Sequence, residues 1–254
     1  MKQCRVDVFT FILMQFQQHS LIHVLIRYLA IGIVFFTCTS TLASKPENVT
    51  PGEISLLPTY CIDTMGFGYG DAYTNTSPRA GKWVAMMGKS FWAMHHFCWA
   101  LIDVRRAASM SSRSPVKAGT LARAVANYQY TINNSTPNFI LLPEIYTKMG
   151  EAELLLSHIG AASDAFQRAR ELKPDYWPPY ASWAEVLVRS GQKAEAKRHL
   201  KLGLEYAPDA KVLIDQYRAL GGDPAEIVPI PKKAAVDAAA DEPAGPASGS
   251  APAK

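Results

Sequence analysis

Three side chains that could bind a metal or act as nucleophiles lie close together in the sequence: His95, His96 and Cys98. Histidine and cysteine ligate transition metals and haem iron, and a thiol beside an imidazole base can attack a carbonyl. His95 and Cys98 share a face of a helix, whereas His95 and His96 point about 100° apart. A metal or haem site here would therefore need further ligands, for which Cys61 and Asp71 are candidates.

A disulfide between Cys61 and Cys98 is the simpler interpretation of the two thiols. These two cysteines remain once the first 43 residues are set aside, and an even pair in an exported chain predicts a bridge. The bridge would contribute about 3 to 4 kcal/mol by the chain-entropy argument. It would also use both thiols, leaving the histidines to satisfy hydrogen bonds at an aromatic-rich helix interface. We therefore predict no catalytic residue, no cofactor and no metal, with His95, His96 and Cys98 as the alternative metal, haem or enzymatic site.

Nucleotide and nucleic-acid binding are excluded by motif and charge. The glycine-rich stretch 66–71 has no convincing strand before it and no helix after it, as a dinucleotide fold requires. Gly88-Lys89-Ser90 has Trp83 where a phosphate loop needs a glycine. The 26 Lys and Arg residues nearly balance the 22 Asp and Glu residues, so no strong basic field is available for a phosphate backbone.

The first 43 residues predict export. Two apolar runs follow basic residues. Thr41 and Ala43 are small residues at positions −3 and −1 relative to a signal-peptide cleavage site before Ser44. Translation starts at Met1 or Met14, and an uncleaved anchor over 21–42 is the alternative. We expect a periplasmic or secreted bacterial protein that touches the membrane only through an uncleaved leader.

A 34-residue period runs through the second half of the chain. Pro174 and Pro208 lie 34 residues apart, each after a helical stretch. At the same spacing, small residues pair with small and large with large: Phe166 with Leu200, Ala162 with Ala196, Gly150 with Ala184, Met149 with Trp183, and Tyr146 with Tyr180. Such a period predicts repeated pairs of antiparallel helices, in which small residues let the backbones approach.

These positions resemble the tetratricopeptide repeat family, whose pattern combines aromatic, small and apolar residues with a closing proline. The two copies span 143–174 and 177–208. They depart from the pattern at Ser157, where the second copy has the turn glycine Gly191, and at Gly203, where alanine is usual. The resemblance implies an all-α fold, a short solenoid of antiparallel helix pairs, and we expect each departure to weaken one helix turn.

A stable array needs about three repeats, so flanking helices must complete the two copies. The chain is therefore predicted to have five parts. They are a signal peptide or anchor (1–43), a loop-rich segment (44–89), a degenerate first helix pair (90–142), two repeats with a capping helix (143–222), and a linker with a disordered Ala/Pro-rich tail (223–254).

The resemblance also implies that the first helix of each repeat lines a partner-binding groove. The corresponding residues are Thr147, Glu151, Leu154 and Leu155 in the first copy and Ala181, Glu185, Val188 and Arg189 in the second. This mixture suits a protein or extended peptide, so we predict an interaction module or scaffold of the cell envelope and not an enzyme. A solvated groove with the partner bound elsewhere, and a structural subunit of an envelope assembly, remain open alternatives.

Overall fold

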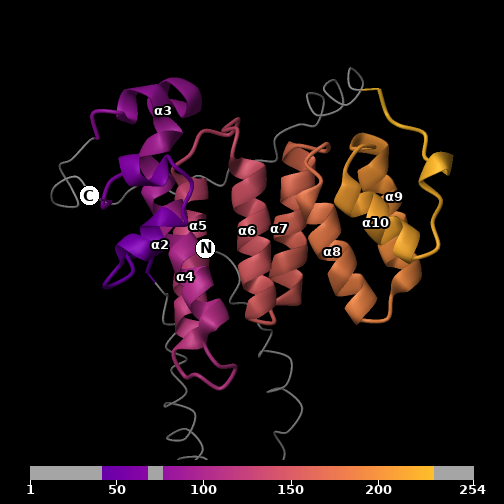
Figure 1. The fold of residues 1–254 in the computed structure, drawn as a ribbon, viewed down its shortest axis with the longest axis horizontal. Coiled ribbons are helices and arrows are strands. Elements are labelled where there is room, and N and C mark those ends of the chain that lie inside the picture. Colours follow the sequence, from indigo (N-terminus) through magenta and orange to yellow (C-terminus); the bar gives the residue numbers. More distant parts are fainter. Residues whose placement is uncertain (1–41, 68–76, 232–254) are drawn as a thin grey trace, which may run out of the picture. The chain divides into compact units, whose positions relative to one another are not determined.

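The fold is known from a computed structural model that describes residues 42–67 and 77–231, and the regular structure in these residues is entirely helical (Figure 1). The helices are α2 (Pro51–Ser55), α3 (Ala80–Met87), α4 (Met94–Ser109), α5 (Lys117–Asn133), α6 (Leu142–Leu155), α7 (Ile159–Leu172), α8 (Pro178–Arg189), α9 (Lys193–Tyr206) and α10 (Lys211–Ala219), with 3-10 turns η1 (Cys61–Asp63), η2 (Gly88–Ala93) and η3 (Pro224–Glu226). The predicted all-α class is confirmed. Residues 1–41, which form most of the predicted leader, and residues 232–254, at the end of the predicted tail, lie outside the described residues.

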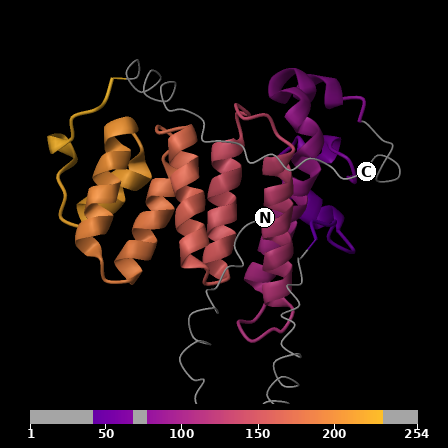
Figure 2. The same ribbon diagram turned by 180° about the vertical axis from the view of Figure 1, so that it is seen from behind.

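Helices α4 to α10 each pack against the next helix along the chain, as the two opposite views show (Figures 1 and 2). The result is a solenoid-like series of antiparallel pairs: α4 with α5, α6 with α7, and α8 with α9. The segment predicted as a degenerate first pair contains α4 and α5, although its first turn is the 3-10 turn η2. Within the described chain, no helix combines the length and apolar character needed to cross a bilayer.

Proline and left-handed residues set the ends of the repeat helices. Pro143 and Pro178 lie in the first turns of α6 and α8, where a missing amide hydrogen costs nothing. The turn after α8 contains Gly191 at a φ of +79°, and the turn after α6 contains Ser157 at a φ of +63°. Because side chains with a Cβ disfavour this region, Ser157 carries a strain that Gly191 avoids.

Close approach at two glycines locks neighbouring helices together. A Cβ on Gly150 of α6 would lie 2.8 Å from the ring of Phe166 in α7. A Cβ on Gly203 of α9 would lie 2.9 Å from both Tyr180 of α8 and Leu213 of α10. The absence of a side chain at Gly203 is therefore a packing requirement, since an alanine there would push two helices apart.

The loop-rich segment before α4 is held by polar links to that helix. Glu53 caps α2 together with Thr50, and its carboxylate accepts hydrogen bonds from Arg106 of α4, one of them at 2.9 Å. Arg106 also donates to the backbone carbonyls of Glu47 and Asn48. One arginine thus fixes both the short helix and the turn that leads into it.

Candidate functional site

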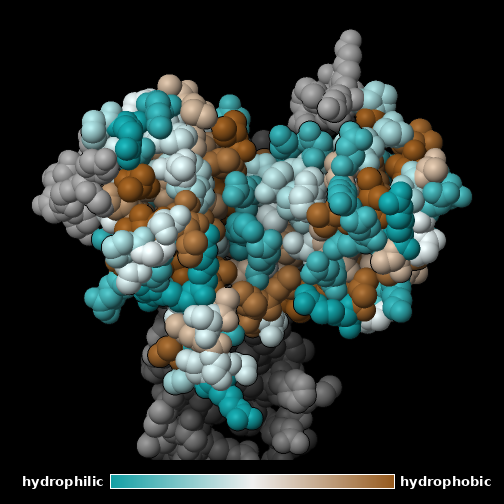
Figure 3. Space-filling view, viewed as in Figure 1, coloured by the Kyte–Doolittle hydropathy of each residue, from teal (hydrophilic) through white to brown (hydrophobic). Residues whose placement is uncertain are grey.

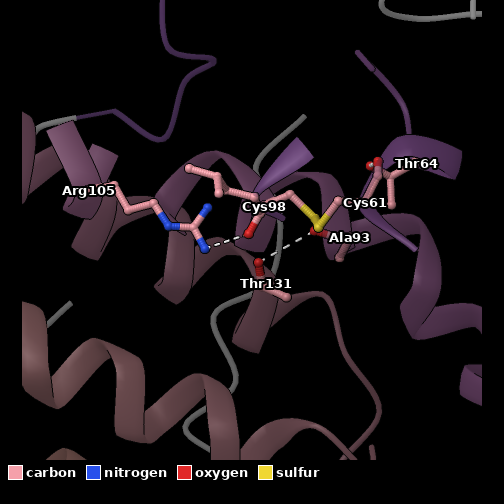
Figure 4. Close-up of a disulfide and its surroundings, with 7 residues drawn as sticks. Cys61, Thr64, Ala93, Cys98, Arg105 and Thr131 are labelled. Atoms are coloured by element: carbon pink, nitrogen blue, oxygen red, sulfur yellow. Dashed lines mark hydrogen bonds between the residues drawn. A yellow bond between two sulfur atoms is a disulfide. The ribbon is translucent and has the colours of Figure 1, made fainter. Parts of the chain in front are cut away.

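The predicted disulfide joins Cys61 of η1 to Cys98 of α4, with the two Cα atoms 5.8 Å apart (Figure 4). Both cysteines are fully buried. The Thr64 hydroxyl donates to the Cys61 carbonyl at 2.7 Å, and Arg105 donates to the Leu56 carbonyl at 2.6 Å. Since Cys98 is oxidised in this bridge, it supplies neither a thiolate ligand nor a nucleophile beside the histidines. Asp71, another candidate ligand, lies outside the described residues.

His95 and His96 lie in the first turn of α4 with their rings in contact. The ring centroids are 4.4 Å apart, and each exposes only 7% of its surface. Trp99 packs edge-on against both imidazoles, and Tyr130 of α5 stacks on His96 at 3.7 Å between centroids. The expected aromatic-rich helix interface is therefore present, and the two helices α4 and α5 build it together.

Each imidazole is fixed by a hydrogen bond at Nδ1. The Nδ1 of His95 lies 2.8 Å from the carbonyl oxygen of Trp92, and the Nδ1 of His96 lies 2.7 Å from Oδ1 of Asn127. The Asn127 amide also donates to the Ser44 carbonyl at 2.9 Å. This chain of bonds joins α4 and α5 to the irregular segment before α2.

Burial keeps both imidazoles neutral at pH 7. Loss of solvation, followed by the neighbouring His96, lowers the pKa of His95 to about 4. Burial also lowers the pKa of His96, although its bond to Asn127 opposes the shift. A neutral imidazole keeps one nitrogen lone pair free to accept a proton or bind a metal.

The residues predicted to line a groove differ sharply in exposure. Thr147 and Ala181 are buried, at 1% and 6% exposure, so a partner cannot reach them. Six of the eight predicted groove residues therefore remain as candidates for partner contact. Leu155 is 48% exposed. The remaining residues are partly exposed (Glu151, Leu154 and Val188) or exposed (Glu185 and Arg189).

Polar contacts join the first helices of successive pairs at a constant spacing. Ser182 of α8 donates to Glu151 of α6 in a long bond of 3.5 Å, and Gln216 of α10 donates to Glu185 of α8 at 3.2 Å. Each pair is separated by 31 residues, and the second pair lies 34 residues beyond the first. The period of the two copies thus continues into α10, which sits where the first helix of another copy would sit.

The surface over these helices is mixed in character. In the view of Figure 1, hydrophilic residues predominate over α6 to α10, and a hydrophobic group gathers near the lower ends of α6 and α7 (Figure 3). Leu155 ends α6 and Ile159 begins α7, and both are about half exposed. A partner that contacts this surface would therefore meet both charged and apolar side chains.

The chain matches no protein-family model, no curated protein and no solved structure.

Two buried carboxylates matter to the structure and were not found from the sequence. Asp103 of α4 is completely buried and accepts two hydrogen bonds from Arg123 of α5, at 2.9 and 2.7 Å. Asp63 accepts from Ser77, Arg79 and Trp83. The only signal for Asp103 was an acid within the apolar run of α4, which predicts a buried partner without naming it.

Proposed function

We propose that this chain is an exported tetratricopeptide-type repeat protein that binds another protein, or an extended peptide, in the bacterial cell envelope. It acts as an interaction module or scaffold and not as an enzyme. The observation that carries the proposal is the repeated contact of Glu151 with Ser182 and of Glu185 with Gln216. Because equivalent residues recur at a fixed interval, the first helices form a series that can meet an extended ligand at regular steps.

The exposed residues on this series suit a ligand of mixed character. Leu155 offers apolar area, while Glu185 and Arg189 offer opposite charges. Glu151 is half-buried and already paired with Lys148 at 2.9 Å, so its charge is partly neutralised. The partner is accordingly a segment that presents apolar side chains and a small number of charges. A long acidic or basic tail would instead need a binding surface whose charges all have the opposite sign.

An exported location is supported by the leader pattern and by the disulfide. The bond between Cys61 and Cys98 is stable in an oxidising compartment and is rare where thiols are kept reduced. The buried position of both sulfur atoms also suits a structural bridge more than a redox-active one.

Site-specific photocrosslinking in intact cells tests the proposal. A photoreactive residue is introduced in place of Glu185 or Leu155 on the first helices. As controls, the same residue is introduced in place of Gln167 on α7 or Lys201 on α9, which are also exposed. We expect one partner protein, identified by mass spectrometry, to crosslink at the first two positions and not at the controls. Equal crosslinking at all four positions, or none at any, contradicts the proposal.

Purified components then measure the interaction directly. The charge reversal Glu185→Lys should weaken binding to the identified partner, because it removes the contact with Gln216 and inverts a charge on the proposed surface. Lys201→Glu is the matched control, a reversal of the opposite sign on an exposed residue of α9. If both reversals change the affinity equally, the partner does not bind specifically to the first helices, and the proposal is contradicted.

A further inference from the structure

The hydrogen bonds of His95 and His96 determine which ring nitrogen carries the proton. The carbonyl of Trp92 can only accept, so Nδ1 of His95 is the donor. The amide nitrogen of Asn127 donates to the Ser44 carbonyl, which directs the amide oxygen toward His96 and makes its Nδ1 a donor as well. Both neutral imidazoles therefore present an unprotonated Nε2.

Neither Nε2 atom is completely enclosed by the protein. Several polar atoms of the described chain are enclosed without a partner, among them Nε2 of His199, but neither Nε2 of His95 nor Nε2 of His96 is enclosed in this way. The aromatic rings of Trp99 and Tyr130 pack against the imidazoles and hold their orientation. The two lone pairs thus lie on rings whose centroids are 4.4 Å apart, and rotation of either ring would break a hydrogen bond.

We propose that His95 and His96 form a two-histidine binding site for a divalent transition-metal ion, which they hold through Nε2. The Nδ1 bonds to Trp92 and Asn127 have the form seen around metal-binding histidines, in which the second nitrogen donates to a carbonyl or amide oxygen. Imidazole ligands favour copper, nickel and zinc, and Cu(II) binds most tightly of the divalent ions.

The protein supplies two ligands and leaves the other coordination positions to water or to a bound molecule. Within residues 42–67 and 77–231, no group of three or more His, Cys, Asp or Glu side chains could hold a metal ion. The disulfide removes Cys98 from the set of ligands. An open site of this kind binds metal more weakly than a closed structural site and exposes the ion for exchange.

Copper titration of the purified full-length chain tests the inference. Cu(II) is added against a competing chelator, and pulsed electron paramagnetic resonance counts the imidazoles bound to the ion. We expect a site with two imidazoles in the wild type and loss of that signal in both His95→Gln and His96→Gln. His158→Gln, which changes an exposed histidine, is the matched control and should retain the two-imidazole signal.

A variant outside the ligand pair separates metal binding from folding. Asn127→Asp keeps a hydrogen-bond acceptor for His96, whereas Asn127→Leu removes it and should weaken copper binding by roughly 10- to 100-fold. Circular dichroism checks that each variant is folded. A two-imidazole signal that persists in folded His95→Gln, or a wild-type signal from a single imidazole, overturns the proposal.

Discussion

The helices before α6 and those after it are held together by different means. Around α4 and α5, a disulfide, a buried carboxylate with its arginine, and an arginine that binds a short helix connect residues far apart in sequence. Around α8, α9 and α10, a separate apolar cluster contains Tyr180, Leu200 and Leu213, and the backbone at Gly203 approaches Tyr180 and Leu213 closely. Both regions have an apolar cluster, but the first adds specific cross-links to its cluster, whereas the second depends on the fit of neighbouring side chains.

The difference follows from what each region must hold. The segment before α4 has only short helices and cannot bury enough apolar surface alone, so cross-links that restrict the unfolded chain add much of its stability. Helices in a repeat contact their nearest neighbours, and each interface is stabilised by contacts close in sequence. Damage to a cross-link should therefore act on one region, while damage to a packing position should act on the repeat that contains it.

Removal of the disulfide is expected to have the largest effect. In the double variant Cys61→Ala/Cys98→Ala, the free energy of unfolding should fall by about 4 kcal/mol, because the bridge closes a long loop. Hydrogen exchange should locate the lost protection in α4 and α5 and leave α8 to α10 protected. Chemical denaturation of the variant and the oxidised wild type measures the change. Unchanged stability, or equal loss of protection in all helices, would refute the division into two regions.

The second prediction concerns packing in the repeats. Gly203→Ala should destabilise the protein by about 1 to 3 kcal/mol, because the new methyl group would clash with Tyr180 and Leu213. Gly160→Ala is the matched control, since a Cβ at that position of α7 meets nothing within 4 Å. Denaturant unfolding should show a loss for the first variant and a neutral or slightly favourable change for the second. A gain for both would mean that helix propensity outweighs packing at Gly203.

The third prediction concerns acid pH and the cross-link between α2 and α4. The hydrogen bond from Arg106 lowers the pKa of Glu53 from 4.5 to about 2, so the folded chain holds this carboxylate ionised where the unfolded chain protonates it. The resulting stability is present above pH 4.5 and is lost as the pH falls toward 2. We expect about 1 to 2 kcal/mol, because the pair is partly exposed.

A comparison with Glu53→Gln isolates that contribution from the other carboxylates. The difference in unfolding free energy between wild type and variant should keep its full value above about pH 5 and should shrink steadily as the pH falls toward 2. Denaturation midpoints at a series of pH values measure it. A difference that stays constant with pH would show that the glutamate acts through its cap of α2 and not through its charge.

The contrast between the regions also explains what the sequence could predict. The packing of α6 to α9 was predictable because the pairs Gly150 with Ala184 and Phe166 with Leu200 recur at one spacing, and each position has a local role. Even there, burial of Thr147 and Ala181 was missed, because the resemblance places residues on a helix face but does not say how closely the next helix covers them.

Long-range polar pairing was much harder to predict. The disulfide could be predicted because Cys61 and Cys98 are the two cysteines outside the predicted leader, whereas Asp103 could have paired with any of several arginines. Likewise, nothing in the sequence connects Asn127 to both His96 and Ser44, since the three residues meet only after the helices have packed. Periodic patterns identify neighbours in a repeat, and unique cross-links require the fold itself.

The smallest effect is expected at the turn that joins the two helices of each repeat. Ser157 and Gly191 both adopt the left-handed conformation, at φ values of +63° and +79°. Ser157→Gly should raise the free energy of unfolding by up to about 1 kcal/mol, since relief of strain exceeds the added entropy of the unfolded chain, and Gly191→Ala should lower it by a similar amount. Thermal and denaturant unfolding measure both. Opposite signs would confirm that the two turns are equivalent, whereas a loss at Ser157 would mean that its side chain contributes more than its backbone strain costs.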